Sequence, residues 1–400
     1  MSFCFDEEIP RDGTHSLKWS FRMRGSQLLY CEPEQPLAES EQWLPLWVAD
    51  MDFRCAPAII EAMQKRVAHG IYGYSAASPG YYATITDWMQ RRHNWSIDPS
   101  WIVITPGVVP ALNLLVQTLL RPGEKVLVQR PVYYPFFSAV QNNGAELVSN
   151  SLLNVAGDYQ MDFEDLQRKA ADPAVKVALL CNPHNPVGRV WQRRELLRFG
   201  EICHANQVRV IADEIHGDLI HDSYRFTPFA SLGPDFQQHS ITCTAASKSF
   251  NLAGLTTSNI IIADSQLREC FAATLHRNGL LGANAFGLVA TEAAYTHGEP
   301  WLDAVLTYIR GNAVHLHAWL DRHLPGVRMS PLQGTYLAWV DGNALPGTAE
   351  ERHRKILEQA RVYLDDGLLF GPEGRGFERF NLACPRRTLD RALQRLVKVL

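Results

Sequence analysis

Two charged residues stand at the ends of apolar runs, where a folded chain buries side chains that carry chemistry. Lys248 lies in AASKSFNLAGL, directly after the run ITCTAA, and Asp213 ends the run VRVIAD. A lysine that forms a Schiff base needs a lowered pKa, which burial at a strand end supplies. Taken singly, a lysine is more often a surface residue and such an aspartate often caps a helix. Because the lysine follows on the next predicted strand, we interpret Asp213 as the partner of a protonated ring nitrogen.

The elements that would position these residues form a repeating pattern. Between residues 102 and 263, helical segments separate the β-branched runs IVIT, KVLVQ, VKVALLC, VRVIAD, ITCTAA and NIIIA. This alternation predicts an α/β fold with a mainly parallel sheet covered on both faces by helices. Four runs end in the polar turns TPG, CNPHNPVG, ADEIHGD and TAASKSFN. Since ligands bind at the carboxyl ends of strands in open α/β sheets, these turns indicate one shared crevice.

The pattern changes after about residue 285. Long helices are predicted over 301–323 and 349–365, and short strands over 335–340 and 377–382. Such a mixture is typical of a smaller α+β domain, which the start of the chain would join because it has little else to pack against. The predicted division is 1–45 for an N-terminal segment packing with the small domain, 46–284 for the large domain and 285–400 for the small domain.

The amino-acid composition limits the classes of partner that this protein could bind. The 400 residues are 46% hydrophobic and carry a formal net charge of -4, so no basic field exists to hold nucleic acid or an anionic membrane. Residues 6–8 are acidic where a secretion signal needs positive charge, and the apolar stretch 108–120 is too short to span a membrane. The eight cysteines form no CxxC pair or metal-like cluster. We expect a cytoplasmic protein with reduced thiols, no bound metal and a small-molecule partner.

Four motifs, CNPHNPVG, IADEIHGDL, AASKSFNLAGL and RFNLACPR, occur in this order. Together they resemble the signature of fold-type I pyridoxal 5′-phosphate (PLP) enzymes, the class I/II aminotransferase superfamily, from LWVADMDF to the last strand. More narrowly, VADMDF, GYS, PVYYPF, DEIHGDL, SKSFNLAGL and NLACPR resemble the MalY/PatB group of cystathionine β-lyases. The resemblance implies a PLP-dependent transferase-like fold with a mainly parallel seven-stranded sheet, and a homodimer.

The same motifs imply roles around the cofactor ring. Lys248 is similar to the Schiff-base lysine that also moves the Cα proton, and Asp213 is similar to the partner of the pyridine nitrogen. Asn185 resembles the asparagine that hydrogen-bonds the cofactor O3′, although it is also a turn residue before proline. His216 stands where aspartate-type aminotransferases commonly have tyrosine, and both a contact with O3′ and simple packing stay open. Tyr133 resembles the ring that stacks on the cofactor.

The phosphate subsite is predicted at a helix start. Gly107, Val108 and Val109 supply backbone N–H groups there, and Ser247 supplies a hydroxyl. Many relatives carry an arginine eight residues after the lysine, but this chain has Thr256. Neutralisation of the phosphate then rests on the helix dipole and hydroxyl groups.

For the stacking ring, the tyrosine from the neighbouring subunit and the substrate arginine, the sequence leaves alternative interpretations open. Tyr134 competes with Tyr133 for the stacking position. Tyr74 resembles the tyrosine that reaches the phosphate of the neighbouring subunit, with Tyr72 as the alternative. Arg379, in ERFN, resembles the bidentate clamp on the substrate carboxylate, although an arginine of an edge strand is ordinarily a surface charge. The arginines that follow at 386 and 387 are interpreted as solvated charges before the last helix.

The resemblance favours β-elimination of a sulfur amino acid, which gives a thiol, pyruvate and ammonia. The alternative is a class I/II aminotransferase acting on an L-amino acid and a 2-oxo acid, because it needs the same lysine, aspartate and arginine. A second alternative is a PLP-binding regulatory protein with little activity. Cystathionine, cystine, cysteine and other S-conjugates all remain candidate substrates.

Overall fold

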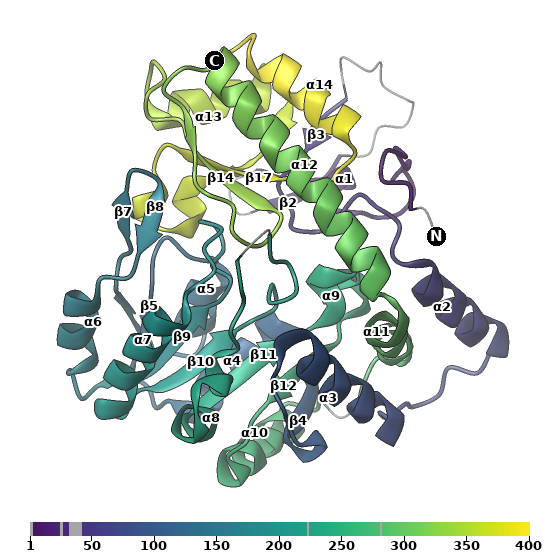
Figure 1. Cartoon of the computed structure of the whole chain (residues 1–400), viewed down its shortest axis with the longest axis vertical. Helices are drawn as coiled ribbons and strands as arrows, with labels where there is room; N and C mark the ends of the chain where they lie inside the picture. The colour runs from purple at the N-terminus through teal and green to yellow at the C-terminus, as the bar shows by residue number, and fades with distance from the viewer. Residues whose placement is uncertain (1–2, 25–26, 32–41, 222–223, 281) are drawn as a thin grey trace.

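A seven-stranded sheet forms the centre of the computed structural model, which describes residues 3–24, 27–31, 42–221, 224–280 and 282–400 (Figure 1). Its strand order is β4-β12-β11-β10-β9-β5-β6, and β12 pairs antiparallel with both of its neighbours while the other pairs are parallel. The predicted α/β class and seven-stranded, mainly parallel sheet are therefore confirmed. The strands are β4 (Ile102–Thr105), β5 (Lys125–Val128), β6 (Glu146–Ser149), β9 (Val175–Cys181), β10 (Arg209–Asp213), β11 (Ser240–Thr244) and β12 (Ser258–Ile261).

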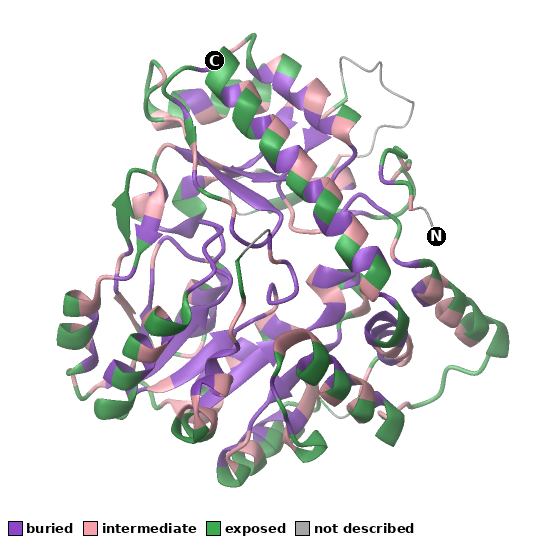
Figure 2. Ribbon diagram, in the orientation of Figure 1, coloured by how far each residue is buried: buried purple, intermediate pink, exposed green. Residues whose placement is uncertain are grey.

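Helices cover both faces of this sheet, which explains why most residues of its central strands are buried. Along β10, Ile211 faces one core with α4 and α10, whereas Val210 and Ala212 face a second core with α6 and α7. Figure 2 shows these strands as a buried layer between helices with exposed outer faces. The helices around the sheet are α3 (Pro79–His93), α4 (Val108–Leu119), α5 (Pro135–Gln141), α6 (Phe163–Ala170), α7 (Arg193–Ala205), α8 (Pro234–His239), α9 (Ala246–Ser249) and α10 (Ser265–Arg277).

A smaller four-stranded sheet, in the order β13-β14-β17-β16, lies above the large one in Figure 1. Its neighbouring strands pair antiparallel, and β15 pairs separately with β3 near the start of the chain. These strands are β3 (Leu44–Pro45), β13 (Arg328–Met329), β14 (Leu337–Asp341), β15 (Val362–Tyr363), β16 (Asp365–Asp366) and β17 (Phe377–Asn381). The remaining α-helices and strands are α1 (Leu17–Ser20), β1 (Phe21–Arg24), β2 (Gln27–Tyr30), α2 (Pro57–His69), β7 (Leu153–Val155), β8 (Asp158–Gln160), α11 (Ala285–His297), α12 (Glu299–His323), α13 (Ala349–Glu358) and α14 (Arg386–Leu396).

One predicted helix is wrong in its second half. The helix expected over 349–365 ends at Glu358, because Arg361 adopts a left-handed backbone with φ of 53° and the chain continues as β15 and β16. The pairing of β15, which directly precedes β16 in the chain, with β3 joins the small-sheet region to residues 44–45. The predicted domain division at residues 45 and 284 stays a prediction.

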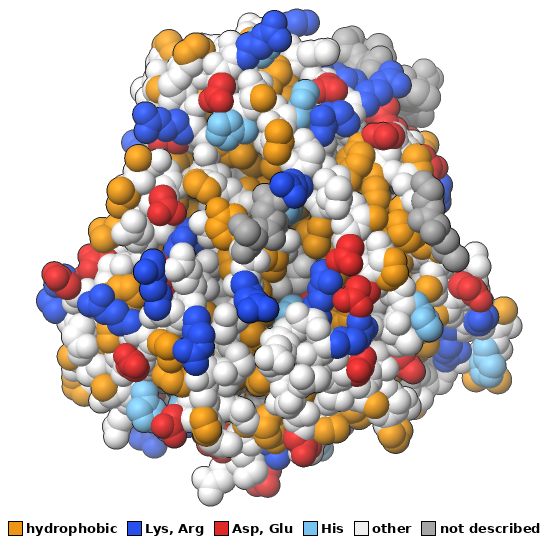
Figure 3. All heavy atoms as spheres, viewed as in Figure 1, with side chains coloured by type: hydrophobic (Ala, Val, Ile, Leu, Met, Phe, Trp, Pro, Cys, Tyr) orange, Lys and Arg blue, Asp and Glu red, His pale blue; other side chains and the backbone are white. Residues whose placement is uncertain are grey.

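Three further features of the described residues concern membrane-spanning helices, metal-binding groups and charged surface patches. No helix in the described part of the chain is long and apolar enough to cross a membrane, and its His, Cys, Asp and Glu side chains form no group of three suited to a metal ion. On the face drawn in Figure 3, basic and acidic side chains are interspersed rather than segregated.

Candidate active site

A cleft enclosing about 770 Å³, part of it open to solvent, lies where β9, β10 and β11 end. It brings together nine of the eleven predicted site residues, which come from five separate segments at or after strand ends. Those nine are Gly107, Val108, Val109, Tyr133, Asn185, Asp213, His216, Ser247 and Lys248. Residues that sequence reasoning gave no role also line it, namely Ala49, Pro110, Cys181, Ile215, Ala253, Thr256 and Thr257.

Lys248 lies on the short helix α9, which begins two residues after β11 ends. Its Nζ donates a hydrogen bond to the Ala49 carbonyl at 2.6 Å. Burial lowers the pKa of Lys248 to about 8; the Asp50 carboxylate opposes that shift and the Arg379 guanidinium adds to it. An amine with this pKa is partly neutral near pH 7 to 8, as a nucleophile or base must be.

Asp213 ends β10 between two thiol-bearing strands, with Cys181 and Cys243 in register on either side. Its Oδ1 accepts the backbone N–H of Ile215 at 3.2 Å. Burial raises the pKa of Asp213 to about 7, against that hydrogen bond and the Lys248 charge. No described residue forms an ion pair with Asp213 within 4.0 Å. The carboxylate therefore presents a buried negative charge for which the described chain supplies no direct cation.

Arg379 lies at the edge of the site on β17, which is flanked by β14 and β16 and so is not an edge strand. Only 3% of the residue is exposed, so the surface-arginine interpretation does not hold. Its guanidinium donates to Asn185 Oδ1 at 3.0 Å and to the Trp47 carbonyl at 2.9 Å, and it pairs with the Asp365 carboxylate. Arg379 Nε is buried and has no hydrogen-bond partner among the described residues.

The aromatic residues of the site are distinguished by their burial. Tyr133 lines the cleft, whereas Tyr134 is 41% exposed and does not line it. His216 is buried, and burial together with the positive charges of Lys248 and Arg379 holds its pKa well below the usual value, so its ring is neutral. Its Nδ1 lacks a hydrogen-bond partner among the described residues. Its ring packs edge-on against the ring of Tyr336, with 6.0 Å between the ring centroids.

The anion-binding end of the cleft is the start of α4. Gly107 adopts φ of 117° before the helix, and no side chain caps the first turn. Its backbone N–H groups are thus left for a ligand, as helix starts allow. Ser247, Thr256 and Thr257 line the same cleft and add hydroxyl groups where the expected arginine is missing.

Two predicted residues, Arg379 and Tyr74, do not line the cleft; Arg379 lies at its edge, whereas the side chain of Tyr74 is fully exposed. Tyr72 is also largely exposed, and its hydroxyl donates to the Val67 carbonyl at 2.7 Å. Both arginines predicted in a turn before the last helix lie in the first turn of α14, and the prediction that they are solvated is wrong for Arg386. Its Nε donates to Asn312 Oδ1 at 2.7 Å, whereas Arg387 is exposed.

Comparison with known proteins shows the family to which this chain belongs. The model of the family "Aminotransferase class I and II" matches residues 41–396. Cystathionine beta-lyase PatB of Bacillus subtilis is 44% identical over 98% of both chains, and Protein MalY of Escherichia coli is 32% identical over 100% of this chain and 99% of its own. The structure of cystalysin from Treponema denticola, which contains pyridoxal 5′-phosphate, matches with a TM-score of 0.93 and 35% identity over 100% of this chain and 99% of that one. The expected PLP-dependent transferase-like fold is therefore confirmed, and the chain belongs to the class I and II aminotransferase family, with the MalY/PatB group among its relatives.

Proposed function

We propose that this protein is a PLP-dependent carbon–sulfur lyase that eliminates a thiol from Cβ of an L-amino acid. The observation that carries the proposal is the pairing, in one cleft, of a lysine whose pKa falls to about 8 and a buried carboxylate without a cation. The full-length similarity to PatB and MalY supports the choice of sulfur amino acids. Products would be a thiol, pyruvate and ammonia.

The residues present fit PLP in charge and shape. A protonated pyridine nitrogen would supply the cation that Asp213 lacks, and Lys248 Nζ would hold the cofactor covalently. The start of α4 with Ser247 would hold the phosphate, although Thr256 in place of arginine leaves that subsite without a formal positive charge. Tyr133 would cover the ring, with Asn185 and the neutral His216 as candidate neighbours of its O3′.

When bound, PLP would supply an electron sink for the pair left at Cα on loss of its proton; that pair then forms the Cα–Cβ double bond as the thiolate leaves with the Cβ–S electrons. Arg379 would bind the substrate carboxylate, and its Nε is a buried donor without a described partner. That contact fixes the Cα–H bond relative to Lys248 Nζ, which in its neutral form accepts the Cα proton. Asp213 would pair with the ring nitrogen of the bound cofactor and favour its protonated form.

The chemistry of these residues does not separate elimination from transamination, which remains the second candidate because of the family's description. The test is pyruvate release from L-cystathionine with no 2-oxo acid added. Pyruvate under this condition supports the lyase, and strict dependence on a 2-oxo acid contradicts it in favour of the aminotransferase. PLP binding without either reaction would favour the PLP-binding regulatory protein.

The protein is further proposed to work as a cytoplasmic homodimer with an N-terminal segment, a large domain and a small domain divided at residues 45 and 284. The exposed aromatic side chains of Tyr72 and Tyr74, next to exposed Ile71, support a subunit contact there. Tyr74 would then reach the phosphate bound in the other subunit. Sedimentation would report a monomer if this proposal is wrong, and Tyr74→Phe should weaken PLP binding.

A further inference from the structure

The loop of residues 47–53, which carries VADMDF, touches both reactive ends of the cleft through backbone carbonyls. The Trp47 carbonyl accepts from Arg379 at 2.9 Å, and two residues later the Ala49 carbonyl accepts from Lys248 at 2.6 Å. Tyr336 also donates to Ala49, at 2.8 Å. The position of this loop therefore sets where the lysine amine and the arginine guanidinium lie relative to each other.

The loop has no helix or strand bonding of its own across these residues, so side chains from other elements hold it. Asn381 donates to the carbonyls on either side of Ala49, at 2.7 and 2.6 Å. Asn251 donates to the carbonyls of Met51 and Phe53 at 3.0 and 2.9 Å. One amide comes from the strand of Arg379 and the other lies three residues after Lys248, so the loop is joined to both sides of the site.

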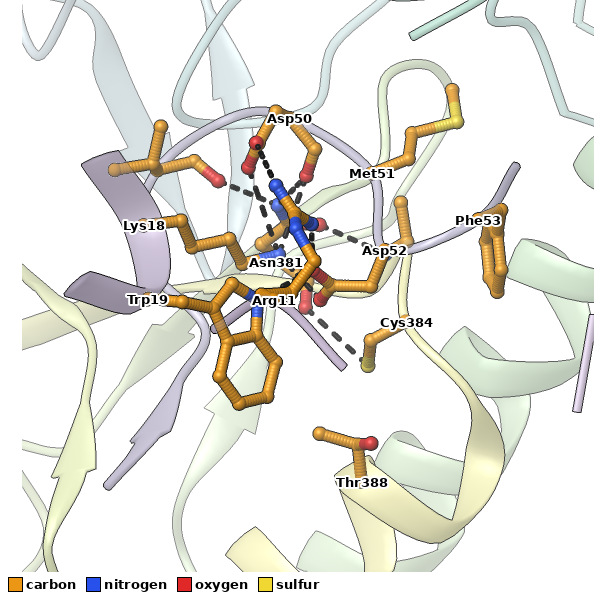
Figure 4. A network of polar contacts seen from close by, with 12 residues as sticks. Arg11, Lys18, Trp19, Asp50, Met51, Asp52, Phe53, Asn381, Cys384 and Thr388 are labelled. Atoms are coloured by element: carbon orange, nitrogen blue, oxygen red, sulfur yellow. Dashed lines mark hydrogen bonds and ion pairs between the residues drawn. The ribbon is translucent and has the colours of Figure 1, made fainter. Parts of the chain in front are cut away.

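The third attachment is a cluster of charges from the N-terminal segment (Figure 4). The Lys18 side chain is fully buried and donates to Asp52 Oδ2 at 2.7 Å and to the Asp50 carbonyl at 3.3 Å. Arg11 and Trp19 donate to Asp52 Oδ1 at 3.0 and 2.8 Å. A buried ion pair with all its main bonds satisfied is rigid, since losing either partner leaves an uncompensated charge.

We propose that Lys18 and Asp52 are positioning residues for Lys248, holding the 47–53 loop so that the Ala49 carbonyl keeps the Lys248 amine in place. This inference rests on the proposed function for its meaning, because only a reactive Lys248 needs such placement. Neither residue lines the cleft, and their effect passes through the backbone of Asp50 to that of Ala49.

The test compares Lys18→Met with wild type, because methionine keeps an unbranched side chain but removes the ammonium group. In the apoprotein, backbone amides of the loop should exchange hydrogen faster, by about tenfold or more. Lys248, released from its carbonyl, should react about threefold faster with acetic anhydride, measured by peptide mass spectrometry. In the holoenzyme, kcat should fall about tenfold or more while KM changes much less, as misplacement of a reacting group predicts.

The matched control is Glu8→Ala, which frees the N-terminal segment from Arg391 but leaves the cluster intact. All three readouts should stay at wild-type values there. Faster loop exchange in Lys18→Met with unchanged Lys248 labelling would overturn the proposal, because the cluster would then only stabilise the fold. The labelling needs no activity, so it decides this inference even if the proposed function fails. If Lys18→Met does not fold, Trp19→Phe is judged by the same criteria.

Discussion

Two lysines donate hydrogen bonds to the same loop, Lys18 fully buried and Lys248 partly buried, and their electrostatic surroundings differ. Burial pulls the pKa of Lys18 down, but Asp52 and Asp50, at 2.7 and 3.9 Å, more than offset it and raise the net value. Burial also dominates at Lys248, where only partial compensation leaves the pKa at about 8. The Lys18 ammonium group forms an ion pair with the Asp52 carboxylate, whereas the Lys248 amine donates to a backbone carbonyl and has no carboxylate at ion-pair distance among the described residues.

The difference separates the residues that stabilise the fold from those that react. A paired buried charge contributes rigidity and no reactivity, whereas an incompletely paired group has a shifted pKa and lowers the stability of the empty protein. Lys18 donates to the Asp50 carbonyl and Lys248 donates to the carbonyl of the preceding residue, Ala49. We therefore expect substitution of Lys248 to reduce mainly activity and substitution of Lys18 to reduce mainly stability.

The largest effect is expected at Lys248. Lys248→Ala removes the amine that would hold PLP and accept the Cα proton, so kcat/KM for pyruvate release should fall about 10⁴-fold or more. The apoprotein of this variant should unfold at no lower urea concentration than wild type, because the lost amine was poorly paired. A large loss of stability would contradict the comparison.

Lys18→Met should reduce the stability of the fold more than it reduces activity, the reverse of what we expect for Lys248→Ala. Removing one partner of a buried pair should reduce the free energy of unfolding by about 3 kcal/mol, measured by urea denaturation. The control is Lys125→Met, which removes an ion pair of similar length, 2.9 Å to Asp172, near the surface. That control should leave the urea midpoint almost unchanged.

Arg379→Lys tests the opposite end of the cleft. Lysine keeps the positive charge but loses the planar pair of donors, and Asn185 and Asp365 would compete for its single ammonium group. KM for the amino acid should rise roughly 100-fold with a smaller change in kcat. An unchanged KM would mean that another residue binds the substrate carboxylate.

The smallest effect is a pH dependence at Asp213. Its pKa is about 7 in the folded protein against an ordinary value of 3.8, so between these values the folded state holds a proton that the unfolded state has lost. Apoprotein stability should therefore fall as pH rises from 4 to 7. Asp213→Asn should remove this loss and stabilise the apoprotein by on the order of 2 kcal/mol at pH 8, and by little at pH 4. Equal differences at both pH values would contradict the shift.

The large sheet and most of the cleft could be predicted because both rest on regular patterns. Runs of β-branched residues mark buried strands, and polar turns after them mark the shared edge. Strand β6 has the short sequence ELVS and partly exposed residues, so it gave no comparable run. The helix over 349–365 was overestimated because the left-handed backbone at Arg361 has no signature in its residue type.

The 47–53 loop could not be assembled from sequence because its bonds use backbone carbonyls, which every residue carries. VADMDF marked the loop as part of the resemblance, but nothing in it identified the Ala49 carbonyl as the acceptor for Lys248. Lys18 is buried by a tertiary contact with Asp52, 34 residues away, and no periodic pattern in LKWS predicts that. Arg386 was misjudged for the same reason, since its partner Asn312 lies on α12.

The central claim is that Lys248 carries the cofactor in this cleft. The most direct measurement is to load the protein with PLP, reduce it with borohydride, digest it and locate the modified lysine by mass spectrometry. We expect the cofactor on Lys248, with no modification in Lys248→Ala. Modification of another lysine, or none in a protein that is folded, would contradict it.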